Sequence, residues 1–370
     1  MAKISCIAIS ALTRTRTLGV KYTYRKDCLG ALSTFSAFVY HPHVTILEGE
    51  KQALYLTKTV LSDDALPATL PTQELLQPIA KELEGFIKDC VIQSRVYGYQ
   101  EKIATREYHN TSLTQNMLRV VATQAHKYPE LLDRSFTFKP KIAADWRRSR
   151  HHIAVRGHPG FLLCSSKPLQ LFASKNEIES TFNQPIQDVA PVSPVIDMSR
   201  YRVQKDLSYG FHPGSPYPYP HTLFLVDLKA KSRPTSQLLS HAIMYSHAVL
   251  RAVAVNEYKI RTDQELIDNP LAMNTIVTNG RMFAFIYYQL NTLNLADNEG
   301  IKNVVWIKHS LPLFQKVKKK EGIIRFNQEC WQLWLSTIMY GIDLQNISDE
   351  YRRIQQLYQR KGDRKAQAVA

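Results

Sequence analysis

The chain has 370 residues, and 47 lysines and arginines against 32 aspartates and glutamates give it a formal net charge of +15. A single core stops growing at about 250 to 300 residues, so this length predicts one large domain or two moderate ones. The hydrophobic content of 44% excludes a disordered or fibrous chain, and no apolar run approaches the ~18 to 20 residues of a membrane-spanning helix. The excess of cations favours a polyanionic partner, a targeting segment or both.

The cysteines do not follow the pattern of a disulfide framework or of a zinc site. They are Cys6, Cys28, Cys90, Cys164 and Cys330. Their number is odd, and neither a CxxC pair nor a short spacing between histidine and cysteine occurs. Disulfide-rich domains and zinc knuckles need such patterns. The cysteine usage therefore indicates a reducing compartment.

Residues 1–26 have the composition of a targeting segment. They contain no acidic residue and six basic ones, and their serines and threonines alternate with isoleucines and leucines. This composition is typical of mitochondrial transit peptides, whereas a secretory signal would have a continuous apolar core. We predict a transit peptide at 1–26 and a location in the mitochondrial matrix. The alternative is a basic arm that stays on the mature protein and contacts nucleic acid.

Residues 27–160 are predicted to form a mainly helical region. Apolar residues recur at spacings of three and four between positions 75 and 90, which indicates an amphipathic helix. They are Leu75, Ile79, Leu83, Phe86, Ile87 and Cys90. A second helix is expected to begin at Ser112, because Ser112 and Gln115 match a capping box, and to end at Pro129.

The most basic stretch outside the leader lies between residues 134 and 160. Its arginines are Arg147, Arg148, Arg150 and Arg156, next to Trp146. Arginine fits phosphate with two parallel hydrogen bonds and an indole offers a stacking plane, so the stretch favours RNA. A second cluster, expected in a loop, is Lys316, Lys318, Lys319 and Lys320. Each cluster alone could be a solvated charged surface, but together they predict RNA contact through backbone charge and shape.

Residues 161–220 are predicted to form an extended connector that is rich in proline. The connector ends in Pro216-Tyr217-Pro218-Tyr219-Pro220. Alternating prolines oppose both a helix and a central strand, because proline lacks the backbone N–H that either would use.

Residues 221–345 are predicted to form a mixed α/β domain. Its elements are a buried strand at Thr222–Val226, a helix at Gln237–Val255 capped by Ser236, a hairpin at Asn279-Gly280, a strand at Val304–Ile307 and a helix at Phe326–Tyr340. This order implies the α/β class, with a mixed sheet flanked by helices. Residues 346–370 are predicted to be a final helix, capped by Ser348, and a basic tail.

Signatures of common enzymes are missing from the sequence. There is no GxxxxGK[ST], GxGxxG or GxSxG motif, so the usual kinase, dehydrogenase and hydrolase interpretations lose their support. Asp197, Asp227 and Lys229 resemble the PD-(D/E)xK nuclease pattern, in which carboxylates hold a divalent cation. A metal-dependent nuclease is therefore the alternative function, and a silent descendant of a nuclease fold is a further possibility, although a D-x-K triplet is common.

The histidines do not predict a metal site. His41 and His43 are close enough in sequence to share an ion, but no third ligand accompanies them. His151 and His152 are adjacent, and adjacent side chains in a strand point to opposite faces. We expect no metal, cofactor or catalytic residue.

Several short runs in the C-terminal half resemble one protein family. They are Val277-Thr-Asn-Gly280, Tyr288-Gln-Leu-Asn-Thr-Leu293, Lys302-Asn303 with Trp306, Leu311-Pro312-Leu313 and Phe326-Asn327, and Tyr55-Leu-Thr-Lys-Thr-Val60 lies upstream. They resemble mL-sixty-five of the mitochondrial ribosome, also called mitochondrial ribosomal protein S-thirty or programmed cell death protein 9. The sister family mL-thirty-seven is similar at Tyr217-Pro-Tyr-Pro-His-Thr-Leu223 and Asn298-Glu-Gly-Ile-Lys-Asn303.

The resemblance implies a structural constituent of the large subunit of the mitochondrial ribosome, which supports translation without enzymatic activity. It also implies contacts with large-subunit ribosomal RNA and other mitoribosomal proteins, and pairing with the sister protein as a heterodimer. It covers about half of the chain, mainly after Pro216, and does not extend over residues 100–160. RNA contact by the arginine cluster therefore depends on the chemistry of its side chains alone.

Overall fold

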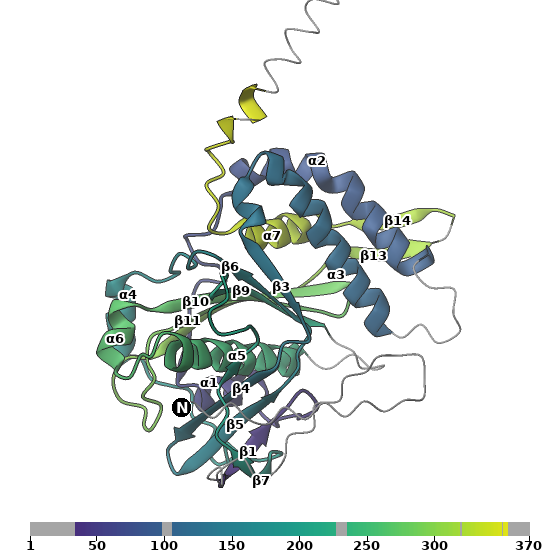
Figure 1. The fold of residues 1–370 in the computed structure, drawn as a ribbon. Helices are drawn as coiled ribbons and strands as arrows, with labels where there is room; N and C mark the ends of the chain where they lie inside the picture. The colour runs from purple at the N-terminus through teal and green to yellow at the C-terminus, as the bar shows by residue number, and fades with distance from the viewer. Residues whose placement is uncertain (1–33, 98–105, 227–234, 319, 350, 354–370) are drawn as a thin grey trace, which may run out of the picture.

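The computed structural model describes residues 34–97, 106–226, 235–318, 320–349 and 351–353. The predicted leader at 1–26 and most of the predicted C-terminal helix and tail lie outside the described residues. The described chain is built in layers, in which helices separate a five-stranded sheet from a seven-stranded sheet and further helices cover the far side (Figure 1). The predicted α/β fold, with a mixed sheet flanked by helices, is confirmed.

The seven-stranded sheet is mixed and carries the main core on both of its faces. Its order is β2 (Thr59–Leu61), β12 (Asn303–Pro312), β11 (Met282–Leu290), β10 (Leu271–Thr278), β9 (Tyr219–Val226), β6 (Phe161–Ser165) and β3 (Arg134–Phe138). β10 pairs with β9 in parallel and β12 with β2 in parallel, and the other neighbours are antiparallel. All eight residues of β10 are buried, as expected for a strand covered on both faces.

The five-stranded sheet contains elements that the sequence did not predict. Its order is β7 (Ser199–Gln204), β1 (Thr34–Tyr40), β5 (His151–Gly157), β4 (Ile142–Arg148) and β8 (Ser208–Tyr209). Only β1 and β5 pair in parallel. A separate hairpin, β13 (Phe314–Lys318) and β14 (Gly322–Phe326), projects at the other end of the molecule (Figure 1).

The helices fill two layers. They are α1 (Glu50–Leu56), α2 (Gln73–Ile92), α3 (Arg106–Ala122), α4 (Lys175–Ser180), α5 (Thr235–Ala252), α6 (Asp263–Asp268) and α7 (Gln328–Met339). Shorter 3-10 turns occupy Thr123–His126, Pro129–Leu132 and Thr181–Asn183, and π-helical turns occupy Gln93–Tyr97 and Val253–Glu257. One hydrophobic cluster packs α1 and α5 between the two sheets, and a second packs α2, α3 and α7 on the outer face of the seven-stranded sheet.

The central helix is more apolar than the sequence suggested. Among the described residues, Thr235–Glu257 is long and apolar enough to cross a membrane, with a mean hydropathy of 1.3. However, 83% of this window is buried inside the protein, where α5 contacts both sheets. A helix that is apolar on all sides is expected at the centre of a folded domain, and this burial accounts for the composition.

Several predicted local structures are confirmed. Asn279-Gly280 forms the turn between β10 and β11, with Gly280 at a φ of +82°. The predicted helix at Phe326–Tyr340 is observed as α7, and there the Asn327 side chain caps the helix by accepting a hydrogen bond from the Cys330 N–H at 3.2 Å. Ser348 begins a helical turn in the same way, as its hydroxyl oxygen accepts from the Tyr351 N–H at 3.3 Å. The buried strand at Thr222–Val226 belongs to β9.

Three details of the predicted helices are wrong. Ser112 lies inside α3, which already begins at Arg106, so the capping-box pattern does not mark its start. Leu75 and Phe86 are exposed, because the buried stripe of α2 includes Leu76 and Val91 instead. Helix α5 begins at Thr235, one residue before the predicted cap Ser236. Each pattern also fits a neighbouring register, and tertiary packing selects between them.

The predicted boundaries do not separate the observed layers. Residues 27–160 contain the helices α2 and α3 but also supply β1, β2, β3, β4 and β5. Residues 161–220 contain β6, α4, β7, β8 and the start of β9 rather than a plain connector. Pro220 pairs with Cys164 where the β6–β9 register shifts, and such an irregular strand start tolerates proline.

Candidate nucleic-acid interface

The predicted arginine cluster lies on the β4–β5 hairpin, and the strands distribute its side chains to different places. Arg147 and Arg148 end β4, Arg150 follows in the turn, and Arg156 is on β5. Because side chains alternate along a strand, Arg147 and Arg148 point to opposite faces. Arg147 and Arg150 are exposed, whereas Arg148 is buried. The cluster is therefore not one continuous RNA surface.

Arg148 is a structural residue, and its predicted RNA contact is wrong. Its side chain is 1% exposed and lies over the Tyr55 ring at 4.3 Å. Its guanidinium donates to Tyr55 O at 2.7 Å, Leu295 O at 3.2 Å and Asp297 O at 2.7 Å, and also to Asn298 Oδ1. These oxygen atoms occupy the guanidinium N–H groups that a phosphate would need. Arg148 instead joins the segment around 295–298 to α1.

Arg156 and Trp146 also have internal partners. Arg156 pairs with Asp145 and donates to Ala144 O at 3.0 Å and to Gln204 O at 3.0 Å. Trp146 is buried, and its indole N–H donates to Leu56 O at 2.9 Å. The indole therefore offers no plane for a base, and Arg156 holds β4, β5 and β7 together. Both were predicted to face RNA, but Trp146 lies in the core and Arg156 is partly buried against the neighbouring strands.

The fold adds a cation that sequence reasoning missed. Arg200 lies on the edge strand β7, pairs in register with Phe38 of β1, and stacks over that ring at 5.8 Å. Phe38 in turn contacts the His151 ring, with centroids 5.5 Å apart. Burial first, and then the nearby charges of Arg150 and Arg200, lower the pKa of His151. Arg150 and Arg200 therefore lie close to the same imidazole, although 50 positions separate them in the sequence.

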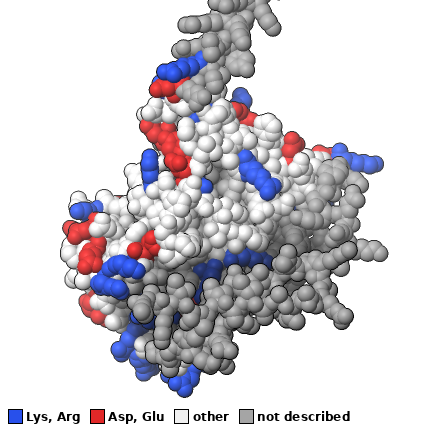
Figure 2. Space-filling view, in the orientation of Figure 1, with Lys and Arg blue, Asp and Glu red and all other residues white. Residues whose placement is uncertain are grey.

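We call Arg147, Arg150 and Arg200 the basic patch. Figure 2 shows blue side chains at the lower end of the molecule, where Figure 1 places the tips of β4 and β5 beside β1 and β7. All three arginines are exposed. Arg147 donates to Ser149 O at 2.9 Å and Arg200 donates to Ser36 Oγ at 2.8 Å, each through Nε alone. Among the described residues, none accepts a hydrogen bond from the terminal nitrogens of these arginines, and guanidinium nitrogens are well suited to phosphate.

The predicted lysine cluster occupies the β13–β14 hairpin, at the opposite end of the molecule from the basic patch (Figures 1 and 2). Lys316, Lys318 and Lys320 are exposed, and Lys319 lies outside the described residues. Lys318 pairs with Glu321 at 2.8 Å, which lowers the net charge of the hairpin tip. The two clusters are thus separate surfaces.

Three of the short runs that carried the family resemblance, at 55–60, 288–293 and 298–303, converge at one buried corner. Lys58 is 1% exposed and donates to Asn294 O at 3.0 Å, next to the loop that Arg148 binds. Asn303 accepts from the Asn291 N–H at 2.8 Å and donates to Thr57 O at 2.9 Å. Buried polar groups of this kind need internal partners, and these residues supply them to one another. These three motifs therefore have a structural explanation that requires no ligand.

The nuclease pattern does not assemble among the described residues. Asp227 and Lys229 lie outside them, and Asp197 is exposed at a turn with a φ of +66°. Gln237, which follows the pattern, donates to Ile46 O and accepts from the Ile46 N–H at 3.1 Å. In the part of the chain that the structure describes, no group of three His, Cys, Asp or Glu side chains could hold a metal ion.

Comparisons with known proteins give a consistent result. A family model described as "Mitochondrial 28S ribosomal protein S30 (PDCD9)" matches residues 227–340. Large ribosomal subunit protein mL37 of Rattus norvegicus is 30% identical over 322 residues, which cover 82% of this chain and 75% of that protein. The Gallus gallus protein of the same name is 30% identical over 320 residues, which cover 82% of this chain and 74% of that protein. The Bos taurus protein of the same name is 30% identical over 321 residues, which cover 82% of this chain and 75% of that protein.

Proposed function

This chain belongs to the family of large ribosomal subunit protein mL37, the sister family mL-thirty-seven of the resemblance above, and on that basis we propose how it is held in the ribosome. It is a structural constituent of the large subunit of the mitochondrial ribosome and supports mitochondrial translation. Its partners there are ribosomal RNA and other mitoribosomal proteins. The observation that carries this function is the 30% identity over most of both chains.

Sedimentation of the endogenous protein tests the ribosomal function. Mitochondrial lysate is separated on a density gradient, and the protein should migrate with the large subunit under conditions that keep the two subunits apart. Chelation of magnesium, which disassembles ribosomal particles, should move it to lighter fractions together with other large-subunit proteins. A protein that stays at the top of the gradient while intact large subunits sediment would refute the assignment.

The chain's role is proposed to be purely architectural, without enzymatic activity. The buried groups with the most perturbed pKa values have structural partners. Burial, followed by the charge of Arg134, lowers the pKa of His221, and this ring contacts Tyr340 O at 3.0 Å. Burial raises the pKa of Cys90 to about 11 and that of Cys164 to about 12, which makes both thiols poor nucleophiles. These groups serve packing rather than acid–base or nucleophilic chemistry.

Contact with ribosomal RNA is assigned in this proposal to the basic patch. The support is the exposure of its three guanidinium groups and the position of two of them, those of Arg150 and Arg200, close to His151. Replacing Arg147, Arg150 and Arg200 with glutamine should reduce the salt dependence of RNA binding by about 0.7 to 0.9 in log–log slope for each lost phosphate contact. The control replaces Lys81, Lys167 and Lys175 with glutamine, because these lysines are exposed and lie outside both predicted clusters. An unchanged slope for the arginine variant would contradict the assignment.

The proposed heterodimer with the sister protein has a candidate surface at β3, the edge strand of the seven-stranded sheet opposite β2. Phe136 and Phe138 lie on one face of this strand and are 41% and 50% exposed, and Leu132 before them is 66% exposed. A cavity of about 330 Å³ adjoins Phe136. Apolar side chains that cluster at an open sheet edge are typical of a protein interface.

Co-expression with the sister protein tests this surface. Phe136→Ser combined with Phe138→Ser should reduce the fraction of the chain that elutes with the sister protein in size-exclusion chromatography. Phe182→Ser is a matched control, because Phe182 is 57% exposed at a different place. Equal complex formation by the double variant and the control would exclude the β3 edge as the interface.

A further inference from the structure

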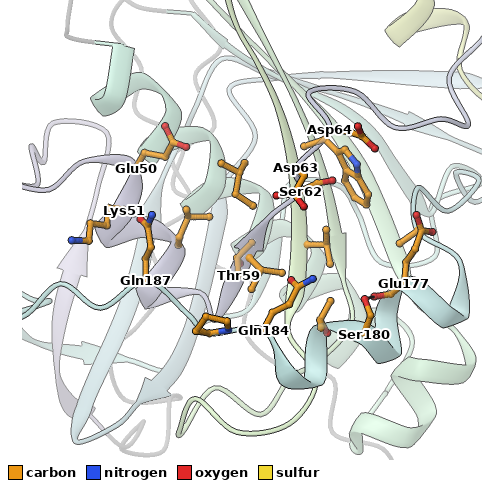
Figure 3. Close-up of a pocket in the computed structure, with 18 of the residues that line it drawn as sticks. Glu50, Lys51, Thr59, Ser62, Asp63, Asp64, Glu177, Ser180, Gln184 and Gln187 are labelled. Carbon is orange, nitrogen blue, oxygen red and sulfur yellow. Dashed lines mark hydrogen bonds between the residues drawn. The ribbon is translucent and has the colours of Figure 1, made fainter.

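A groove of about 760 Å³ follows the other edge of the seven-stranded sheet. Figure 3 shows Thr59 of β2 near the middle of the groove, α1 on one side and α4 on the other, and the segment after α4 passes below Thr59 to bring Gln187 beside Lys51. Val304 and Trp306 of β12 also line it. The groove therefore exposes the edge of the sheet between two helical walls. This arrangement admits an extended chain more readily than a compact ligand.

The edge strand presents free pairing positions to the groove. Lys58 O accepts from the Asn303 N–H at 3.0 Å, and the Ser62 N–H donates to Val305 O at 2.9 Å. Because the backbone groups of a strand alternate in direction, those of Thr59 and Leu61 point away from β12. Thr59 is only 1% exposed, so the backbone N–H and C=O that a partner can reach are those of Leu61. The Leu61 side chain is also 44% exposed. An edge of this kind is a template for a further strand.

The lining of the groove is acidic, although the whole chain is basic. Five carboxylates and one ammonium group line it, namely Glu48, Glu50, Asp63, Asp64 and Glu177 against Lys51. The lining thus carries a formal charge of −4 on a protein whose total is +15. Among the described residues, Glu48, Glu50, Asp63 and Asp64 form no ion pair. Such a surface repels phosphate and attracts lysine and arginine.

We propose that this acidic groove binds an extended, lysine- or arginine-rich segment of a neighbouring protein, which pairs with β2 as an added strand. Backbone hydrogen bonds to Leu61 supply the register, and the carboxylates select basic side chains. The proposal rests on the ribosomal function only for the origin of the neighbouring protein, because a large ribonucleoprotein brings many basic protein segments together. The groove can be tested apart from the particle.

The test measures fluorescence anisotropy of a labelled peptide with the purified full-length chain. The probe is a nine-residue peptide in which lysine and valine alternate, and a peptide of alternating glutamate and valine is its counterpart. The lysine peptide should bind and the glutamate peptide should not. Equal binding of both peptides would overturn the proposal. Loss of binding here would leave sedimentation with the large subunit unaffected, so the two results separate the groove from the ribosomal function.

Charge is tested by Asp63→Asn combined with Asp64→Asn, which preserves side-chain shape. Exposed ion pairs contribute modestly, so we expect affinity for the lysine peptide to fall about 2- to 30-fold. The control is Asp133→Asn combined with Asp343→Asn, which removes the same charge from exposed sites outside the groove. Equal affinity of the two double variants would overturn the proposal.

Strand pairing is tested by Leu61→Pro, which removes the N–H that faces the groove but no hydrogen bond to β12. Leu61→Ala keeps that N–H and is the control. Leu61→Pro should lose most of the peptide binding while its urea midpoint stays near that of Leu61→Ala. If the two variants bind equally, no strand is added at β2.

Two other occupants are distinguished by competition. A single-stranded oligoribonucleotide should not displace the lysine peptide, and displacement would identify the groove as an RNA surface instead. The chain's own tail is tested in a full-length variant with glutamine at Lys361, Arg364 and Lys365. If this variant binds the peptide several-fold more tightly than the wild type, the tail occupies the groove and the partner proposal is wrong.

Discussion

Replacing Arg148 with methionine provides the sharpest test of the structural assignment in the arginine cluster. Methionine keeps the flexible apolar stem but removes all the hydrogen-bond donors. The carbonyls of Tyr55, Leu295 and Asp297 would each lose a donor, and only some of this loss can be compensated by water, because the Leu295 contact is buried. The stacking on the Tyr55 ring at 4.3 Å would also disappear.

The expected loss of stability follows from these contacts. An unsatisfied buried acceptor costs about 1 to 3 kcal/mol, and breaking a buried charged network typically costs about 3 to 5 kcal/mol. We therefore expect Arg148→Met to lower the free energy of unfolding by about 3 to 5 kcal/mol. The total free energy of unfolding of a folded domain is only about 5 to 15 kcal/mol, so this change should be large and easily measured.

Urea unfolding, followed by tryptophan fluorescence and far-UV circular dichroism, measures this change. Arg147→Met is the matched control, because the adjacent Arg147 is exposed and its loss should alter the free energy of unfolding by no more than about 0.5 kcal/mol. RNA binding should respond in the opposite order, weakening in Arg147→Met. If Arg148→Met unfolds at the same urea concentration as Arg147→Met but loses RNA binding, the structural role of Arg148 is refuted.

Two further predictions concern buried or strained positions. Burial is the main cause that lowers the pKa of His221 and His247 in the folded chain. The unfolded chain therefore binds more protons below pH 6.5, and the free energy of unfolding should decrease by up to about 1.4 kcal/mol for each ring and each unit by which the pH is lowered. Urea midpoints at pH 5.5 and 7.5 measure this dependence, which should be weaker in His247→Gln; an identical dependence would contradict it. Gly280→Ala should lower the free energy of unfolding more than Gly300→Ala does, although both glycines have a positive φ, of +82° and +78° respectively. Only at Gly280 would the new methyl group meet a side chain, 1.9 Å from Asn110 Oδ1, and equal urea midpoints would refute this.

Local chemistry made parts of the fold predictable from sequence. The hairpin at Asn279-Gly280 requires positive φ, which Gly280 adopts at +82°. The buried strand β9 and the helix α7 were likewise predicted from patterns within one short stretch each. Each of these signals is contained in a short stretch of chain, so tertiary packing did not alter it.

The five-stranded sheet was not predictable in this way. Its edge strand β7 is exposed at almost every position, so it shows no alternation of apolar and polar residues. In β4, alternation places Ile142, Ala144, Trp146 and Arg148 on one face, and an arginine in that series disguises the pattern. The acceptors that allow Arg148 to be buried are as far as 150 positions away, at Asn298.

The candidate site shows the same limit. Composition identified the β4–β5 hairpin as basic, but only the pairing of β7 with β1 reveals that Arg200 joins Arg150 beside His151. The period-two pattern could have separated Arg147 from Arg148, had these residues been recognised as a strand. No sequence signal marks the acidic groove, because its carboxylates come from separate segments, 48–64 and Glu177.

The pairing of β2 with β12 has a consequence for the order of folding. The Asn303 side chain donates to Thr57 O across a separation of 246 positions, and the strands beside this contact close one edge of the sheet. During synthesis from the N-terminus, β2 therefore cannot pair with β12 until most of the chain, through residue 305, has emerged. α1 and β1 likewise lack α5, which they pack against in the finished core, until residues 235–252 have emerged. The first segments to appear are thus among the last to become native, and a chaperone that shields residues 34–61 should speed the folding of this chain more than one that shields its C-terminal half.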